Sequence, residues 1–229
     1  MIVSYIWSWS VYELYQTCPR KYEKTYLKRE YVEPEDNRQH ADWGEHVHKA
    51  LQNAVETDQP IPDNMVDLQL EQRVAMLRNA PGTILVEQKL ALDAQLRPCD
   101  YYDKDKVWVR AIGDYVCINP AGTRALTLDY KTGKRKLTDQ LKLLALVLFQ
   151  HYPNLETVDS GFMWIKLKGK IDVETYHRKD RLRLWGAFLP TLAQLKESHR
   201  LDIWPTKRNG LCLKYCPVTD CPYNGSFRG

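Results

Sequence analysis

The sequence predicts an α/β protein with a mixed central sheet flanked by helices. Segments with apolar residues at helical spacing occupy both ends of the chain, while β-branched or alternating runs separated by turn residues fill its middle. One cysteine near the start of the chain and three near its end further predict that a metal site joins the N- and C-terminal segments. The 229 residues, 44% hydrophobic and 27% charged, fit a single domain over 1–229.

The first part of this domain, 1–82, is expected to be helical. Its helices are predicted over three segments: Ser8–Leu27, Gly44–Val55 and Asn64–Asn79. Ser8 or Ser10 would cap the first helix, because a serine hydroxyl can accept a hydrogen bond from a free N–H of the first turn. The polar stretch Glu30–Ala41 contains Pro34 and is expected to be a loop.

The central part, 83–178, carries the predicted sheet. Its strands are expected over five segments: Thr83–Leu92, Val107–Ile118, Ala125–Lys131, Gly161–Lys168 and Lys170–Arg178. The strongly apolar segment Leu137–Tyr152 has helical spacing and separates the third strand from the fourth.

The last part, 179–229, combines a helix with an irregular tail. The helix is expected over Asp180–His199, interrupted or kinked near Pro190. From Trp204 on, prolines and glycines interrupt the sequence and no periodicity is visible, which suits a loop held by a metal.

Four cysteines indicate where that metal would sit: Cys18, Cys212, Cys216 and Cys221. Clustered cysteines in a reducing compartment are more often metal ligands or redox groups than disulfides, and four thiolates suit either zinc or an iron–sulfur cluster. Their spacing does not match the paired Cys-x-x-Cys knuckles of a zinc ribbon. The alternative is four buried thiols that pack as small hydrophobic groups. Cys99 and Cys117 are expected to be packing residues.

Carboxylates and a lysine in the central strands predict a catalytic site. Asp129 and Lys131 end the strand Ala125–Lys131, and residues two apart on a strand project to the same side. Asp114 is a lone carboxylate in the apolar run Ala111–Val116, where an unpaired charge is costly. A neighbouring strand could bring Asp114 beside Asp129, and the two carboxylates would then need a cation such as Mg²⁺ between them. The alternative is an exposed salt bridge along the strand.

These residues resemble a known nuclease family. Asp114 followed by Asp129-Tyr130-Lys131 is similar to the PD-(D/E)XK motif in its RecB-like branch, which also carries an iron–sulfur cluster. Gly44-Glu45-His46-Val47-His48 resembles that branch's Gly-x-x-x-His helix, and Gln140-Leu141 resembles its glutamine motif. The arrangement of one cysteine plus three is similar to that of CRISPR-associated RecB-type nucleases and the AddB helicase–nuclease subunit.

The resemblance implies a restriction-endonuclease-like core and a role for each matching residue. The catalytic residues would be Asp114, Asp129, Lys131 and Gln140. The ligands of Mg²⁺ or Mn²⁺ would be His48, Asp114, Asp129 and the carbonyl of Tyr130. The ligands of a [4Fe–4S] cluster would be Cys18, Cys212, Cys216 and Cys221. His46 is expected to face solvent, and Glu87 is either a further active-site carboxylate or the partner of a core arginine.

The function implied is that of a metal-dependent DNA nuclease. An exonuclease acting on DNA ends or single strands, in recombination, repair or phage DNA metabolism, fits best. The alternative is a catalytically poor iron–sulfur DNA-binding subunit of a recombination or replication complex. A homo-oligomer or a recombination partner is compatible with either function.

Charge and hydropathy set outer limits on location and partners. The net charge of +4 does not by itself argue for nucleic acid, although Lys134, Arg135 and Lys136 near Lys131 could track phosphates. The apolar stretches are too short for a membrane span. Met1–Trp7 lacks the basic region and apolar run of a signal peptide, so a cytoplasmic location without membrane contact is expected.

Overall fold

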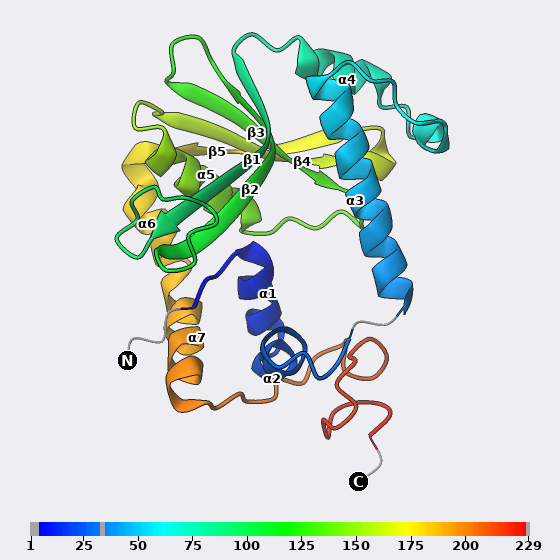
Figure 1. The fold of residues 1–229 in the computed structure, drawn as a ribbon, viewed down its shortest axis with the longest axis vertical. Coiled ribbons are helices and arrows are strands. Elements are labelled where there is room, and N and C mark those ends of the chain that lie inside the picture. The colour runs from blue at the N-terminus through cyan, green and yellow to red at the C-terminus, as the bar shows by residue number, and fades with distance from the viewer. Residues whose placement is uncertain (1–4, 33–34, 228–229) are drawn as a thin grey trace. The chain divides into compact units, whose positions relative to one another are not determined.

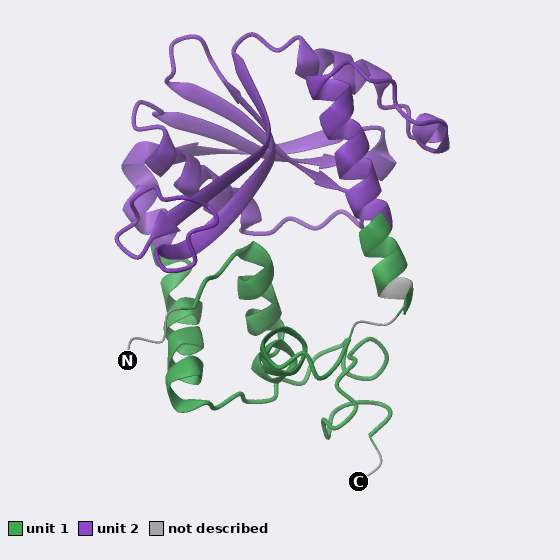
Figure 2. Ribbon diagram, in the orientation of Figure 1, with its two compact units in different colours: residues 1–42, 186–229 green, residues 43–185 purple. Residues whose placement is uncertain are grey.

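The computed structural model describes residues 5–32 and 35–227, which form two compact units (Figures 1 and 2). Both ends of the chain make one unit, within residues 1–42 and 186–229, and we call it the terminal unit. The middle of the chain, residues 43–185, makes the other, and we call it the sheet unit.

A mixed five-stranded sheet organises the sheet unit, as the sequence predicts (Figure 1). Its strands follow one another across the sheet in chain order: β1 (Thr83–Asp93), β2 (Val107–Ile118), β3 (Arg124–Lys131), β4 (Thr157–Trp164) and β5 (Lys170–His177). Strands β3 and β4 run parallel, and the other three pairs are antiparallel. The parallel pair needs a crossover, which helix α5 (Gln140–His151) provides.

Strands β2 and β3 separate in the middle of the sheet. Their pairing reaches only from Ile118 to Tyr115 on β2. Strand β2 nevertheless stays paired with β1 as far as Val107, and β3 stays paired with β4 as far as Lys131. Asp114 is therefore the first residue of β2 beyond the shared ladder, at a point where the sheet opens.

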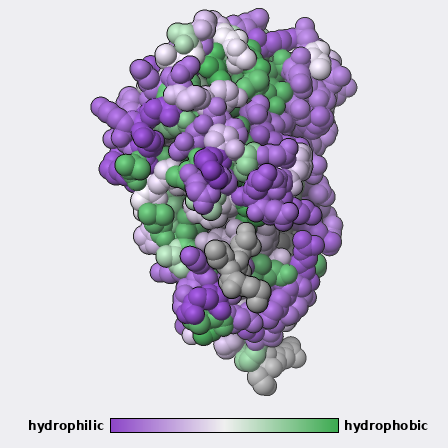
Figure 3. Space-filling view, turned by 60° about the vertical axis from the view of Figure 1, so that its left-hand side comes forward, coloured by the Kyte–Doolittle hydropathy of each residue, from purple (hydrophilic) through white to green (hydrophobic). Residues whose placement is uncertain are grey.

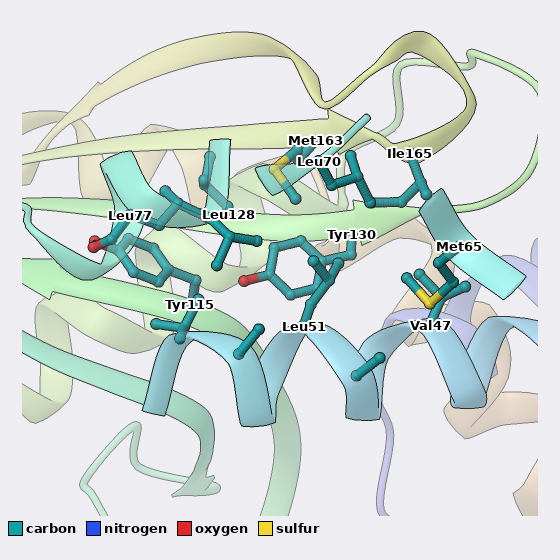
Figure 4. Packing of buried hydrophobic residues seen from close by; sticks show 14 of the residues in the cluster. Val47, Leu51, Met65, Leu70, Leu77, Tyr115, Leu128, Tyr130, Met163 and Ile165 are labelled. Atoms are coloured by element: carbon teal, nitrogen blue, oxygen red, sulfur yellow. The ribbon is translucent and has the colours of Figure 1, made fainter. Parts of the chain in front are cut away.

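Helix α3 (Glu35–Glu56) lies against one face of this sheet, together with α4 (Glu71–Arg78). Figure 4 shows Val47 and Leu51 of α3 pointing toward the sheet, with the rings of Tyr115 and Tyr130 reaching toward the helix. These four side chains are at most 2% exposed. Burial of each such side chain stabilises the fold by roughly 1.5–3 kcal/mol, so α3 is held firmly against the sheet.

Helix α5 covers the opposite face. Thr127 and Leu128 are neighbours on β3 and so point to opposite sides of the sheet. Leu128 belongs to the cluster beneath α3, whereas Thr127 lies by Gly113 and Leu144 of α5. A Cβ at Gly113 would come within 2.8 Å of the Val116 side chain, so the close packing on this face favours glycine there.

The terminal unit consists of short helices and the C-terminal tail. Its helices are α1 (Trp9–Thr17), α2 (Pro19–Lys21), a π-helical turn (Tyr22–Leu27) and α7 (Leu189–Leu201). The Ser8 side chain caps α1 by accepting the N–H of Val11, which confirms one of the two predicted caps. Hydroxyls of tyrosines join these helices, as between Tyr15 and Ser198 at 2.8 Å and between Tyr22 and His199 at 3.0 Å.

Two predicted element boundaries near the N-terminus are wrong for physical reasons. The predicted helix Ser8–Leu27 breaks at Cys18, whose backbone is extended, because a proline disfavours the helical conformation of the residue before it. The predicted loop Glu30–Ala41 is helical from Glu35, where α3 begins nine residues before Gly44. That stretch is polar and lacks the apolar spacing that marks a helix packed on a core. Pro34 lies outside the described residues.

Three other predicted segments are divided or shifted. Asn64–Asn79 consists of a 3₁₀ segment, Asp63–Leu68, and α4, separated by Gln69 in a left-handed conformation. The predicted strand Gly161–Lys168 is β4, four residues earlier, followed by a 3₁₀ turn. Asp180–His199 is two helices, α6 (Arg181–Gly186) and α7, with Pro190 in the first turn of α7.

None of the helices in the described part of the chain has the length and apolar character needed to cross a membrane. The face drawn in Figure 3 is mostly hydrophilic, with hydrophobic residues in separate areas. Scattered apolar residues are usual on protein surfaces.

Candidate functional site

Three potential metal ligands meet where the sheet opens. His48 comes from α3, Glu87 from β1 and Asp114 from β2, and one ligand atom of each lies within 4.8 Å of the others. Among the residues that the structure describes, this is the one group of three or more histidine, cysteine or acidic side chains that is so close.

The side chain of Asp114 is held by the backbone of β3, the strand from which β2 separates. Its Oδ2 accepts a hydrogen bond of 2.6 Å from the N–H of Tyr130, and its side chain is buried. The carbonyl of Tyr130 pairs with His48 Nε2 at 2.9 Å, and His48 Nδ1 lies 3.4 Å from Asp114 Oδ2. One backbone unit of β3 therefore orients both the carboxylate and the imidazole.

Glu87 reaches the site from an unusual backbone conformation. It faces Asp114 in the β1–β2 register, between the pairs Val86↔Tyr115 and Gln88↔Gly113, but its φ of 48° is left-handed. Such a conformation is uncommon for a residue other than glycine and marks local strain, which is frequent at functional sites. Burial and the nearby Asp114 carboxylate raise the pKa of Glu87.

Asp129, Lys131 and Gln140 form a second group at the same opening. Lys131 Nζ lies 2.7 Å from Asp129 Oδ2 and donates to Gln140 Oε1 at 2.8 Å. The amide of Gln140 donates to Asp129 Oδ1. The expected shared face of Asp129 and Lys131 is thus present, and Gln140 at the start of α5 holds both side chains.

The electrostatics of the opening favour a cation. Burial raises the pKa of Asp129 to about 6, an effect that Lys131 opposes and Asp114 reinforces. Burial disfavours the charged form of His48, but Asp114 and Asp129 together raise its pKa above the usual value. Carboxylate oxygens and one imidazole are a donor set that suits Mg²⁺ or Mn²⁺, so the residues present fit a divalent ion.

A comparison with known protein families identifies the family to which the chain belongs. The family described as the PD-(D/E)XK nuclease superfamily matches residues 6–222. The chain belongs to this superfamily. PD-(D/E)XK nucleases are generally metal-dependent phosphodiester hydrolases that use Mg²⁺- or Mn²⁺-type ions, so membership implies a metal-dependent nuclease, with DNA as the substrate that the superfamily suggests.

Other comparisons are more distant. A solved structure titled "Crystal structure of SSO0001" resembles this chain with 13% identity and a TM-score of 0.41, over 96% of this chain and 87% of that one. No curated protein matches the chain by sequence.

The four predicted cluster cysteines of this PD-(D/E)XK protein lie in the terminal unit. Together they line a single cavity, and all are free thiols. Cys18 stands at the break between α1 and α2, while Cys212, Cys216 and Cys221 come from the tail. The N–H of Asn209 lies 3.3 Å from the Cys212 sulfur, the kind of hydrogen bond that stabilises a metal-bound thiolate.

The tail is attached to the N-terminal helices around this cavity. Lys207 Nζ donates to the carbonyl of Gln16 at 2.7 Å. The side-chain amide of Asn209 donates to the carbonyl of Thr17 at 3.1 Å. Arg20 pairs with Asp220 at 3.2 Å. Four thiols in one cavity with adjacent cations are a donor set that fits a metal cluster, because the cations offset the charge of the thiolates.

The sequence left the role of Glu87 undecided, and the structure brings Glu87 together with His48 and Asp114 in the group that could hold a metal ion. A carboxylate in an apolar strand was the sequence feature that pointed to Glu87. The direction of its side chain, however, depends on a left-handed backbone conformation that no local sequence pattern encodes. His46 is exposed, as expected, and contacts Asn64. Cys117 is buried against the helix-covered core, which confirms its packing role, whereas Cys99 is only partly buried.

Proposed function

We propose that this protein is a RecB-like deoxyribonuclease that works as an exonuclease on DNA ends or single strands. One observation carries the proposal. The ligand atoms of His48, Glu87 and Asp114 converge within 4.8 Å beside the ion pair of Asp129 and Lys131. Carboxylates, an imidazole and a lysine gathered at a strand opening are the groups that metal-assisted phosphodiester hydrolysis requires.

The residues of this chain have distinct roles in the proposed reaction. A bound divalent ion supplies a water of lowered pKa and neutralises charge on the scissile phosphate. His48, Glu87, Asp114 and Asp129 hold that ion. Lys131 stabilises the negative charge that develops on the phosphate oxygens, and Gln140 positions the lysine through its hydrogen bond of 2.8 Å.

Action on ends or single strands is supported by the parts that the described helices and strands build. They build the sheet, the helices that cover it and the terminal unit. Reading a base sequence in duplex DNA takes a helix or ribbon that enters the major groove. Digestion from an end requires only that a strand reach the opening between β2 and β3.

We also propose that Cys18, Cys212, Cys216 and Cys221 hold a [4Fe–4S] cluster, supported by the cavity that all four line. The cluster would close a loop of nearly the whole chain. If a disulfide-like estimate applies, such closure removes roughly 5 kcal/mol of unfolded-state entropy. The role of the cluster is therefore structural.

A digestion assay tests the nuclease function. End-labelled single- and double-stranded DNA is incubated with the wild type in Mg²⁺, in Mn²⁺ and in EDTA, and products are sized with time. We expect stepwise shortening from an end that needs the divalent ion and is lost in Asp129→Ala. DNA that is bound but left intact by the wild type in both ions would favour a non-catalytic DNA-binding subunit. Internal cuts in circular DNA would contradict exonuclease action but would leave the nuclease function standing.

A further inference from the structure

The loop between β1 and β2 holds two adjacent tyrosines beside two cations. Lys89 Nζ donates to the hydroxyl of Tyr102 at 2.6 Å and lies 5.3 Å from the centre of its ring. The guanidinium of Arg110 lies 5.0 Å from the centre of the Tyr101 ring. The two tyrosine rings meet edge to face, with centres 5.2 Å apart. We call these four residues the tyrosine–cation strip.

The strip begins next to the metal-ligand group. Lys89 follows Glu87 by two residues on β1, and Arg110 precedes Asp114 by four residues on the paired strand β2. At about 3.3 Å per residue, the two cations stand roughly 7 Å and 13 Å along the strands from the candidate ligands. A strand of nucleic acid cut at the metal site could therefore continue along the strip.

The loop is folded back so that its tyrosines have fixed positions. A bridge joins Leu92 to Pro98, and the N–H of Cys99 donates to the carbonyl of Ala91 at 3.1 Å. The segment after Cys99 therefore returns along β1 toward Lys89. The N–H of Tyr102 donates to an Asp100 oxygen at 2.6 Å, which holds the backbone of that residue.

Tyr102 remains open to solvent although it is held in place. Its side chain is 66% exposed, and its hydroxyl is hydrogen-bonded to Lys89. A fixed ring with a free surface is what a stacking base requires, since the ring loses little freedom on binding.

The cations of the strip are available to phosphates. Within the described residues, neither Lys89 nor Arg110 forms an ion pair with a carboxylate. Two acidic residues near the strip have cations of their own, because Asp93 pairs with Arg97 at 2.7 Å and Asp103 pairs with Lys106 at 3.3 Å. The exposed Lys89 and the partly buried Arg110, beside two tyrosines, complement the phosphates and bases of an unpaired strand.

We infer that the tyrosine–cation strip binds single-stranded DNA and guides it to the metal site. Tyr102 stacks on a base, while Lys89 and Arg110 bind phosphates. The inference rests on the proposed function, because it takes DNA as the substrate. It adds a preference for an unpaired strand, since a base in a duplex has no free face to offer Tyr102.

The test is fluorescence anisotropy of a labelled oligothymidylate, with EDTA present so that no DNA is cut. We expect Tyr102→Ala to weaken binding about tenfold or more, and Tyr102→Phe, which keeps the ring, to retain most of the affinity. Replacing both cations, Lys89→Ala with Arg110→Ala, should reduce the slope of log affinity against log salt by about 1.4, the value for two phosphate contacts on a single strand. Lys104→Ala removes an exposed cation from the same loop and serves as the control.

The outcomes separate the strip from the nuclease function. Wild-type affinity and salt slope in both the Tyr102→Ala and the double variant would overturn the strip, even if the enzyme digests DNA. An equal loss on a blunt duplex would overturn the single-strand preference, and tighter strip-dependent binding of oligouridylate would overturn DNA as its ligand. Conversely, strip-dependent binding by a protein that cuts no DNA would uphold the strip while the nuclease function fails. Circular dichroism checks that each variant is folded.

Discussion

In the metal-free protein, ionisation of Asp129 should lower the free energy of unfolding. Burial raises the pKa of Asp129 from 3.8 to about 6, although Lys131 opposes the rise. The folded state thus holds this proton more tightly than the unfolded state does. The stability that the proton provides is present below pH 4 and is lost as pH rises through about 6. A difference of about two between the pKa of Asp129 in the folded and unfolded states corresponds to about 3 kcal/mol in the free energy of unfolding.

The substitution Asp129→Asn isolates this effect. It removes the ionisable group but keeps an oxygen that can accept the hydrogen bond from Gln140. Free energies of unfolding are measured by urea denaturation in EDTA, from pH 4 to pH 8. We expect wild-type stability minus variant stability to fall by about 2.5 kcal/mol over this range, less than the full value of about 3 kcal/mol because the unfolded carboxyl is already partly ionised at pH 4. Asp105→Asn, at an exposed aspartate in the β1–β2 loop, is the control and should show no such trend.

The divalent ion should reverse the loss. At a concentration 100 times its Kd, an ion that binds only the folded protein adds about 2.7 kcal/mol. We expect Mn²⁺ to stabilise the wild type at pH 8 by about this amount and to stabilise Asp129→Asn much less. A wild-type minus variant difference that stays constant or grows with pH would refute the reasoning.

Further predictions concern other residues of the two sites. Lys131→Ala should lower kcat about 100-fold or more while Mn²⁺ affinity by calorimetry stays near that of the wild type, because the lysine acts on the transition state; parallel loss of ion binding would contradict this. Glu87→Gln should weaken Mn²⁺ binding about tenfold in the same titration, and unchanged affinity would remove Glu87 from the site. His48→Ala should impair Mn²⁺-supported cleavage more than Mg²⁺-supported cleavage, since imidazole suits the softer ion, and equal losses would argue against ligation. Protein purified without oxygen should be brown; Cys18→Ala should lose both the colour and stability to urea, whereas Cys99→Ala should keep both, and a colourless wild type with bound zinc would refute the cluster.

Local patterns were sufficient for most of the sheet. The predicted strand Val107–Ile118 is β2 from end to end, because β-branched and aromatic residues there fit a half-buried pleated surface. The pairing of Asp129 with Lys131 followed from strand periodicity alone. The break at Cys18 was also encoded locally, since Pro19 follows it, but helical spacing on both sides concealed it.

Other features depend on contacts between distant segments. The first turns of α3 are polar in sequence and lack an apolar stripe, so nothing in their spacing distinguishes them from a loop. Glu87 meets His48 and Asp114 only because β1 pairs with β2 in one particular register and bends at a left-handed residue. The separation of β2 from β3 after Tyr115 is likewise a property of the assembled sheet.

Anomalous diffraction from crystals soaked in Mn²⁺ tests the central claim most directly. At the manganese edge, we expect a difference peak within bonding distance of His48, Glu87 or Asp114, at the opening where β2 leaves β3. Asp129→Asn crystals treated in the same way should show a weaker peak at the same position. A strong manganese peak elsewhere in wild-type crystals, with none at this opening, would contradict a metal-dependent site built from these residues.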